Sequence, residues 1–256
     1  MDFSALHRGP RPLLLPNAWD HASAAALAAR GFPAIGTTSL GVAAAAGLPD
    51  GAGVTRAETL ALARKLGDLP CLVSVDIEGG FGEGPASVAA LAEELAGLGL
   101  AGLNIEDGRG DRLAETGHQQ RLVAAIKEAA PGLFVNARTD THWLGRGEDG
   151  ARDDEAISRA RAYVEAGADG IFVPGMTGEE SIARLVAAVD VPVNILFSPR
   201  GPGYRRLGEL GVRRVSCGSL LFRAALDAAL RTVSAIAADQ PVPGDIIGYA
   251  EVQALS

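Results

Sequence analysis

The chain alternates between short β-like runs and helical runs rich in alanine and leucine along most of its length. We predict strands at residues 13–17, 34–39, 72–78, 102–107, 133–139, 170–174, 193–197 and 214–218. We predict helices at residues 21–30, 56–66, 87–97, 119–130, 155–166, 179–189, 203–210 and 220–238. Eight strand–helix units in one chain are typical of an α/β protein that folds as a (β/α)8 TIM barrel.

Glycines at the helix ends agree with this pattern. Gly31, Gly99, Gly167 and Gly211 each follow a predicted helix and precede a predicted strand, where a left-handed C-cap favours glycine. An open, doubly wound sheet is the alternative architecture. The first predicted strand lacks the Gly-X-Gly-X-X-Gly turn of dinucleotide-binding proteins, which weakens that version of the alternative.

The length of 256 residues suits a single α/β barrel, and we find no linker. We therefore expect one (β/α)8 barrel domain over residues 1–256. The C-terminal extension, about 240–256, lies outside the repeating pattern and contains Pro241 and Pro243. We expect this extension to cap the barrel or to reach a neighbouring subunit.

Charge and composition argue against several classes of partner. The net charge is −8 and no run of lysine or arginine occurs, so we expect no nucleic-acid partner. Two cysteines cannot form a disulfide framework and suit a reducing cytosol. No signal-like N-terminus and no apolar segment long enough to span a membrane is evident, so we expect a cytoplasmic protein without a membrane partner.

Polar residues gather where the predicted strands end. In barrels of this type the chemistry collects at the carboxyl ends of the strands and in the loops that follow. The residues concerned are Asn17, Thr38, Ser39, Asp76, Glu78, Glu106, Asp107, Arg138, Asp140, Asn194 and Ser216. This distribution predicts an active site at that end.

Asp76 and Glu78 are the most informative pair, because side chains two residues apart on a strand point to the same face. Two carboxylates on one face repel each other unless a cation lies between them. A hard divalent ion held by carboxylates and waters satisfies this requirement. With Glu106 ending one later strand and Arg138 another, the pattern predicts a metal-dependent enzyme that acts on a small anion.

Five segments together resemble the isocitrate lyase and phosphoenolpyruvate mutase superfamily, in its order and spacing. They are residues 16–20, 37–51, 74–82, 104–108 and 136–140. The resemblance implies a (β/α)8 barrel whose eighth helix is exchanged with a neighbouring subunit. It also implies a homo-oligomer, often a dimer of dimers, that binds Mg²⁺, with Mn²⁺ as an alternative. Known members make or break C–C or P–C bonds next to a 2-oxo acid or its enolate.

The same resemblance assigns roles to particular residues. Asp76 matches the direct metal ligand, Glu78 the acid that holds the waters of the metal, and Glu106 a further acid of the metal shell. Asp50 matches the acid of the loop after the second strand. These assignments leave a local alternative for Asp50, because Pro49-Asp50-Gly51 is also a turn signal.

Other matches concern the substrate, a small anionic 2-oxo acid. Thr38 and Ser39 match small residues that hold its carboxylate through backbone N–H groups and a hydroxyl. Arg138 matches the arginine that clamps the oxo acid, and Asn194 matches a substrate-binding asparagine. Asn17 is a further candidate for the substrate site, although capping of a strand end is an alternative role for it. Asp50, Glu106 and Arg138 are thus the expected catalytic residues.

The loop after the fourth strand departs from the superfamily pattern. Isocitrate and methylisocitrate lyases have a Lys-Lys-Cys-Gly-His type of loop there, whereas this chain has Gly108-Arg109-Gly110-Asp111-Arg112. Phosphoenolpyruvate mutases have a lysine in place of Gly108 and an asparagine that is absent here. The loop at residues 108–117 is glycine-rich and charged, which indicates a lid. Glu115 and His118 are the local candidates for a proton donor.

We therefore expect a Mg²⁺-dependent lyase or decarboxylase that forms an enolate from an oxaloacetate-, methylisocitrate- or dimethylmalate-like acid. A P–C bond enzyme of the phosphonopyruvate hydrolase or phosphoenolpyruvate mutase type is one alternative. A non-catalytic 2-oxo-acid-binding protein is another. A Schiff-base aldolase is disfavoured, because Lys65 and Lys127 both fall in predicted helices.

Overall fold

A parallel sheet of nine strands closes on itself through the first segment of the chain. Pro16 has no N–H group for the ladder, and it separates β1 (Leu13–Leu15) from β2 (Asn17–Ala18). β1 pairs with the strand at Arg214–Ser216, and β2 pairs with the strand at Ala34–Thr37. The single strand predicted at residues 13–17 is therefore divided, and its two halves join the two edges of the sheet. The remaining strands are β3 (Ala34–Thr37), β4 (Leu72–Asp76), β5 (Gly102–Glu106), β8 (Phe134–Arg138), β9 (Gly170–Phe172), β10 (Val193–Leu196) and β11 (Arg214–Ser216). The predicted (β/α)8 barrel is confirmed.

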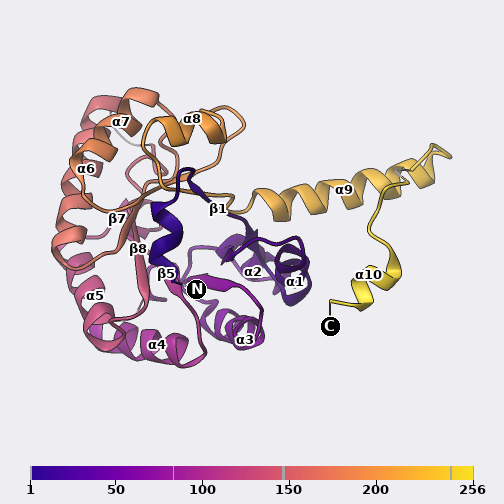
Figure 1. The fold of residues 1–256 in the computed structure, drawn as a ribbon, viewed down its shortest axis with the longest axis horizontal. Helices are drawn as coiled ribbons and strands as arrows, with labels where there is room; N and C mark the ends of the chain where they lie inside the picture. The colour runs from indigo at the N-terminus through magenta and orange to yellow at the C-terminus, as the bar shows by residue number, and fades with distance from the viewer. Residues whose placement is uncertain (1, 83, 146–147, 243, 256) are drawn as a thin grey trace.

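The computed structural model describes residues 2–255 apart from 83, 146, 147 and 243. Most of the helices surround the barrel, and the last two extend away from it (Figure 1). The helices are α1 (His21–Ala29), α2 (Ser39–Ala45), α3 (Arg56–Leu66), α4 (Pro85–Gly97), α5 (Thr116–Ala129), α6 (Asp149–Glu165), α7 (Glu179–Ala188), α8 (Tyr204–Glu209), α9 (Leu220–Ala237) and α10 (Tyr249–Gln253). Each predicted helix is present, although α4, α5 and α6 begin earlier than predicted. In α4 the earlier start is at Pro85, a residue favoured in the first helical turn.

Three short elements within the barrel were not predicted, in addition to α10 in the C-terminal extension. The first is α2, which begins after β3 with Thr38 between them. The second is a hairpin of β6 (Gly108–Arg109) and β7 (Arg112–Leu113) after β5. The third is the 3₁₀ helix η1 (Ser4–Arg8) before β1.

Alternating residues of each strand face either the helices or the barrel interior. In β5, Leu103 and Ile105 belong to the large core between the sheet and the helices, together with Leu91 and Leu122. Asn104 and Glu106 alternate with them and so face the interior. This alternation places polar side chains in the barrel and apolar side chains beneath the helices.

The N-terminal end of the barrel is closed by η1. Phe3 and His7 contact Phe134, and the rings of His7 and Phe134 are stacked with centroids 4.6 Å apart. His7 is buried, and its Nδ1 lies 3.0 Å from the carbonyl oxygen of Phe3. Burial, with a further contribution from the nearby Arg214 guanidinium, lowers the pKa of His7 to about 4.

The last long helix, α9, leaves the barrel (Figure 1). Its apolar side chains are open to solvent, with Leu230 66% and Ile236 60% exposed. The described chain beyond α9 also lies outside the barrel, and its expected role as a cap or a contact to a neighbouring subunit remains a prediction (Figure 1). No helix in the described part of the chain has the length and apolar character needed to cross a membrane.

Candidate active site

A pocket of about 260 Å³ opens where the barrel strands end. Its polar lining includes Asn17, Thr38, Ser39, Asp50, Asp76, Asn104, Glu106, Arg138 and Asp140. Its apolar lining consists of Leu40, Trp143, Leu144, Phe172, Pro174 and Leu196. The structure thus brings the predicted site residues together, apart from Glu78 and Asn194. The roles expected for them remain predictions.

Arg138, at the end of β8, is held between two carboxylates. Its Nη1 lies 2.7 Å from Glu106 Oε2, because Glu106 and Arg138 are partners in the register of β5 and β8. Its Nε and Nη2 donate to the two carboxylate oxygens of Asp140, at 2.6 and 3.1 Å. Burial alone would lower the pKa of Arg138, but Glu106, Asp140 and Asp76 outweigh that effect and raise it. Arg138 is therefore a permanent, oriented cation, and Asp140 supports it.

Asp76, at the end of β4, belongs to a crowded set of acids. Burial raises the pKa of Asp76, the guanidinium of Arg138 opposes this, and the charges of Asp50 and Glu78 raise it further. Burial also raises the pKa of Glu106, where the nearby acids outnumber the single cation Arg138. Negative charge therefore exceeds positive charge at this wall of the pocket.

Glu78 is not where the strand argument placed it. β4 ends at Asp76, and Glu78 has a φ of 50°, so the alternation of a strand does not extend to it. Its carboxylate accepts hydrogen bonds from Gly53 N–H, at 2.9 Å, and from the Thr55 hydroxyl. The prediction that Asp76 and Glu78 share one strand face is wrong, because β4 ends at Asp76 and the backbone of Glu78 itself is left-handed. Through these hydrogen bonds Glu78 instead holds the loop before α3, and its charge acts on the nearby Asp76.

Asn194 lies inside the barrel and not in the pocket wall. Leu196, two residues further along β10, has the wall position, so Asn194 is one layer deeper. It is 1% exposed, and both polar atoms of its amide lack a partner among the described residues. The prediction that Asn194 contacts the substrate is therefore not supported by its position.

Asn17 lies in the pocket wall, but its amide is engaged by the backbone. Its Oδ1 accepts hydrogen bonds from the N–H groups of Cys217 and Gly218, at 2.9 and 2.8 Å. Its Nδ2 donates to the carbonyl oxygen of Thr37 at 2.7 Å. The alternative role at a strand end is therefore present, and contact with a substrate remains a prediction.

Thr38 and Ser39 both line the pocket, but their backbone N–H groups differ in whether they already have a partner. The N–H group of Thr38 donates to Ala18 in the sheet, at 3.0 Å, so it is not available to a carboxylate, contrary to our expectation. Ser39 is the first residue of α2, where backbone N–H groups lack partners within the helix and favour an anion. Binding of a substrate carboxylate at the start of α2 remains a prediction.

Sequence reasoning missed Asn104 and the apolar wall. Asn104 Oδ1 accepts from Asn136 Nδ2 at 2.8 Å and from Arg214 at 3.2 Å, which leaves its Nδ2 for the pocket. Its position two residues before Glu106 was a signal, since both face the interior. Trp143 lies 6.0 Å from the guanidinium of Arg138, in the loop after β8, where strand patterning gives no information.

The described part of the pocket wall contains no cysteine, histidine, lysine or tyrosine. Gly108 and Gly110 of the hairpin form part of the wall. Glu115 caps α5 and His118 follows within that helix, and neither residue lies in the wall. The structure therefore does not place either predicted proton donor at the site.

The acidic side chains of the pocket offer oxygen atoms that a divalent ion can use as ligands. Among the described residues, no group of three histidine, cysteine or acidic side chains forms a ready cage for a metal. Mg²⁺ commonly takes only one or two protein carboxylates and keeps several waters. Asp76 and Glu106 provide such oxygens in a wall with excess negative charge, so the residues present fit Mg²⁺ or Mn²⁺.

Comparison with known proteins agrees with the fold and the position of the site. A family model described as phosphoenolpyruvate phosphomutase matches residues 3–237. The uncharacterized protein Rv1998c of Mycobacterium tuberculosis is 44% identical over 99% of this chain and 95% of its own length. A crystal structure of a Burkholderia cenocepacia J2315 protein superposes with a TM-score of 0.88, at 34% identity, over 98% of this chain and 93% of that one.

Two further relatives have named activities. A 2-methylisocitrate lyase of Bacillus subtilis is 35% identical over 79% of this chain and 69% of its own length. An oxaloacetate decarboxylase of Rhodopseudomonas palustris is 31% identical over 81% of this chain and 73% of its own length. Barrel, acidic wall and relatives together define an enzyme of the lyase and mutase class. The chain belongs to the phosphoenolpyruvate mutase family and is related to the 2-methylisocitrate lyases.

Proposed function

We propose that this protein is a Mg²⁺-dependent lyase or decarboxylase that cleaves a C–C bond next to a small 2-oxo or 2-hydroxy di- or tricarboxylate. The observation that carries the proposal is the position of Arg138 beside Asp76 and Glu106 in one pocket. A fixed cation next to two carboxylates that can hold a divalent ion suits a substrate that is an anion and becomes an enolate. The lyase and decarboxylase activities named for its relatives support the same class.

The residues of the chain bind and orient the substrate. Arg138, held by Asp140, presents a guanidinium to a carboxylate, and Ser39 at the start of α2 offers backbone N–H groups to the same kind of ligand. Asp76 and Glu106 would hold the divalent ion. When bound, that ion supplies Lewis-acid polarisation of the substrate carbonyl and stabilises enolate charge. Trp143 and Phe172 line the pocket near Arg138 and would limit the access of water to a bound substrate there.

Decarboxylation of oxaloacetate is the simplest reaction for this pocket. The described wall offers no cysteine, histidine, lysine or tyrosine to protonate an enolate. Water can supply that proton after loss of CO₂, whereas reversible cleavage of a citrate-like acid needs a placed acid. We therefore rank oxaloacetate first, followed by methylisocitrate- and dimethylmalate-like acids.

A P–C bond enzyme is the second candidate, and the family match favours it. Against it stands the loop after β5, where Gly108 occupies the position of the mutase lysine. A 2-oxo-acid-binding protein without turnover is the third candidate. Binding without product formation would distinguish the third candidate from the other two.

We also propose that the chain forms a homo-oligomer, with a dimer of dimers as the expected state. The support is α9, whose exposed Leu226, Leu230, Val233 and Ile236 do not contact their own barrel core. An exchanged helix would bury these side chains against a second copy. Light scattering of the wild type and of Leu230→Glu tests this; a monomeric wild type contradicts it.

The test of the function is a turnover screen with Mg²⁺, with Mn²⁺ and with EDTA. The panel is oxaloacetate, 2-methylisocitrate, isocitrate, 2,3-dimethylmalate, phosphonopyruvate and phosphoenolpyruvate, with release of pyruvate, glyoxylate or phosphate followed. We expect metal-dependent pyruvate formation from oxaloacetate that EDTA abolishes and Asp76→Ala removes. Turnover of phosphonopyruvate alone would replace this proposal with the P–C alternative.

A further inference from the structure

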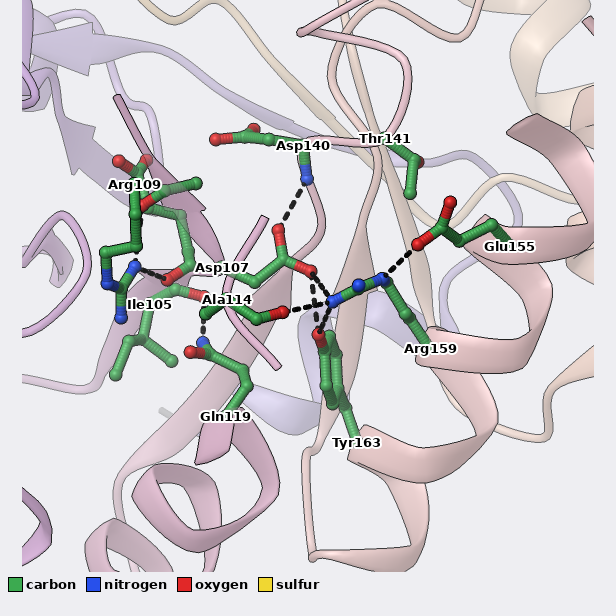
Figure 2. A network of polar contacts seen from close by, with 12 residues as sticks. Ile105, Asp107, Arg109, Ala114, Gln119, Asp140, Thr141, Glu155, Arg159 and Tyr163 are labelled. Carbon is green, nitrogen blue, oxygen red and sulfur yellow. Dashed lines mark hydrogen bonds and ion pairs between the residues drawn. The ribbon is translucent and has the colours of Figure 1, made fainter. Parts of the chain in front are cut away.

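A buried polar network next to the pocket joins α6 to the ends of β5 and β8 (Figure 2). Its centre is Asp107, which directly follows β5 and is 0% exposed. Asp107 Oδ2 accepts hydrogen bonds from the Tyr163 hydroxyl at 2.7 Å and from Arg159 Nη1 at 3.2 Å. Asp107 Oδ1 accepts from the N–H group of Asp140 at 2.8 Å. Asp107 itself does not line the pocket.

Helix α6 presents the donors of this network from one face. Glu155, Arg159 and Tyr163 are spaced by four residues, so they lie above one another on the helix. Arg159 Nε pairs with Glu155 at 3.0 Å, and Glu155 is half exposed. Arg159 Nη1 points inward to Asp107 and also donates to the carbonyl oxygen of Ala114 at 2.8 Å. Arg159 therefore contacts two segments that follow β5.

The hairpin in front of Ala114 is held at both ends. Ala114 N–H donates to the carbonyl oxygen of Asp107 at 2.8 Å. At the other end, Arg109 donates to the carbonyl oxygens of Glu106, Gly108 and Gly79, at 2.8, 2.7 and 2.9 Å. These contacts hold both strands of the hairpin against the pocket, and the lid that the sequence indicated remains a prediction.

The same network leads to the substrate clamp. Asp107 fixes the backbone of Asp140, and the carboxylate of Asp140 fixes Arg138 through two hydrogen bonds. A Cβ atom on Gly108 would lie only 2.2 Å from Asp140 Oδ2, so the hairpin also limits where that carboxylate can be. Arg138 is thus positioned from α6 through a series of direct contacts.

We propose that Arg159 and Tyr163 are positioning residues, which act through Asp107 and Asp140 to set the Arg138 guanidinium relative to the hairpin wall. The inference deepens the proposed function and rests on it for its kinetic test. Neither residue touches the pocket. Their effect reaches the substrate because misplacing a clamp by about 1 Å is enough to slow an enzyme roughly a hundredfold.

The experiment compares four variants in a Trp19→Phe background, which leaves Trp143 as the tryptophan reporter beside Arg138. Tyr163→Phe removes one donor to Asp107 and keeps the ring. Arg159→Lys keeps the charge and loses the fork that contacts both Asp107 and Ala114. Glu155→Gln is the matched control, because it removes the outer partner of Arg159 and leaves Asp107 untouched. Arg138→Lys sets the size of effect that a lost clamp produces.

Three readouts are taken for each folded variant: kcat and KM, the emission maximum of Trp143, and hydrogen exchange of the Asp140 and Ala114 amides. We expect Tyr163→Phe to melt cooperatively, to lower kcat/KM roughly tenfold, mostly through KM, and to shift Trp143 emission in the direction of Arg138→Lys. Arg159→Lys should do the same to a larger extent, and Glu155→Gln should match the background protein. Both amides should exchange faster in Tyr163→Phe and Arg159→Lys.

Wild-type KM and unshifted Trp143 emission in Tyr163→Phe would overturn the inference, even if stability falls, because the network would then be merely structural. Should Arg159→Lys fail to fold, Tyr163→Phe decides alone. If the background protein turns over none of the acids, the proposed function fails. The positioning role is then judged by Trp143 emission and by exchange of the Asp140 amide, which do not require turnover.

Discussion

The two ends of the barrel are built in opposite ways. At the N-terminal end, η1 closes the barrel with the rings of Phe3, His7 and Phe134, where His7 stacks on Phe134 and Phe3 meets both rings edge-on. At the C-terminal end, Asp76 and Glu106 share one wall with a single clamp arginine. Rings in contact stabilise the fold, whereas crowded carboxylates cost stability and are kept for chemistry. A change at one end should therefore affect stability, and a change at the other should affect activity.

The largest expected effect is at the acidic end. Asp76→Asn removes an oxygen charge that a divalent ion needs, so we expect a loss of about 10³ in kcat/KM, or about 4 kcal/mol of transition-state stabilisation. The melting temperature should stay the same or rise, because repulsion among the carboxylates falls. Steady-state kinetics and thermal melts of the metal-free protein measure both. A fall of many degrees in that melt would contradict the division between the ends.

Phe134→Ala tests the opposite end. The side chain is buried between Phe3 and His7, so we expect a loss of about 3–5 kcal/mol in the free energy of unfolding. The kcat/KM of the folded fraction should change less than about twofold, because the site is at the far end of the barrel. Urea denaturation and kinetics at low temperature measure this. Loss of activity without loss of stability would show that the ends are coupled.

His7 gives the N-terminal end a dependence on pH. Its pKa is lowered to about 4 in the folded protein, whereas an unfolded histidine titrates near 6.5. Between these values the unfolded chain binds the proton more readily, so stability is full above about pH 6.5 and falls as the pH drops toward 4. The loss should be roughly 2–3 kcal/mol. His7→Gln should flatten this acid limb in urea denaturation between pH 4 and 7; an unchanged limb assigns it to other groups.

The smallest effect is expected on the outer surface, away from both ends of the barrel. Arg64 and Glu94 form a surface ion pair at 2.6 Å between α3 and α4, and both are well exposed. Arg64→Met should change the free energy of unfolding by less than about 1 kcal/mol. It should leave kcat/KM unchanged, which makes it the reference against which the other variants are compared. A larger change in either quantity would mean that the outer helices, too, influence one of the ends.

The barrel could be predicted from the sequence because each strand–helix unit repeats the same local pattern. The acids and Arg138 could be predicted because they end strands, and strand ends meet at one rim. Glu78 was misplaced because the strand ends two residues earlier, and a φ of 50° cannot be seen in residue types. Asn194 was misplaced by one layer, since the pattern gives the face of a strand but not the depth along it.

Tertiary contacts account for what the sequence did not reveal. The sequence placed Asp107 only at a strand end, because its partners Arg159 and Tyr163 lie more than fifty residues away on α6. Likewise, α2 consists mostly of small residues, and much of it is buried against the barrel. Local propensity does not specify such long-range packing.

The closing pair of strands has a consequence for how the chain matures. Leu13 to Leu15 find their partners only at Arg214 to Ser216, and Asn17 is bonded to Cys217 and Gly218. During synthesis the first strand must therefore wait, with one edge unpaired, until nearly the entire chain has left the ribosome. An unpaired strand edge is a site for association with other chains. The period of greatest vulnerability to aggregation is thus set by the rate of translation, and it ends when the last strand arrives.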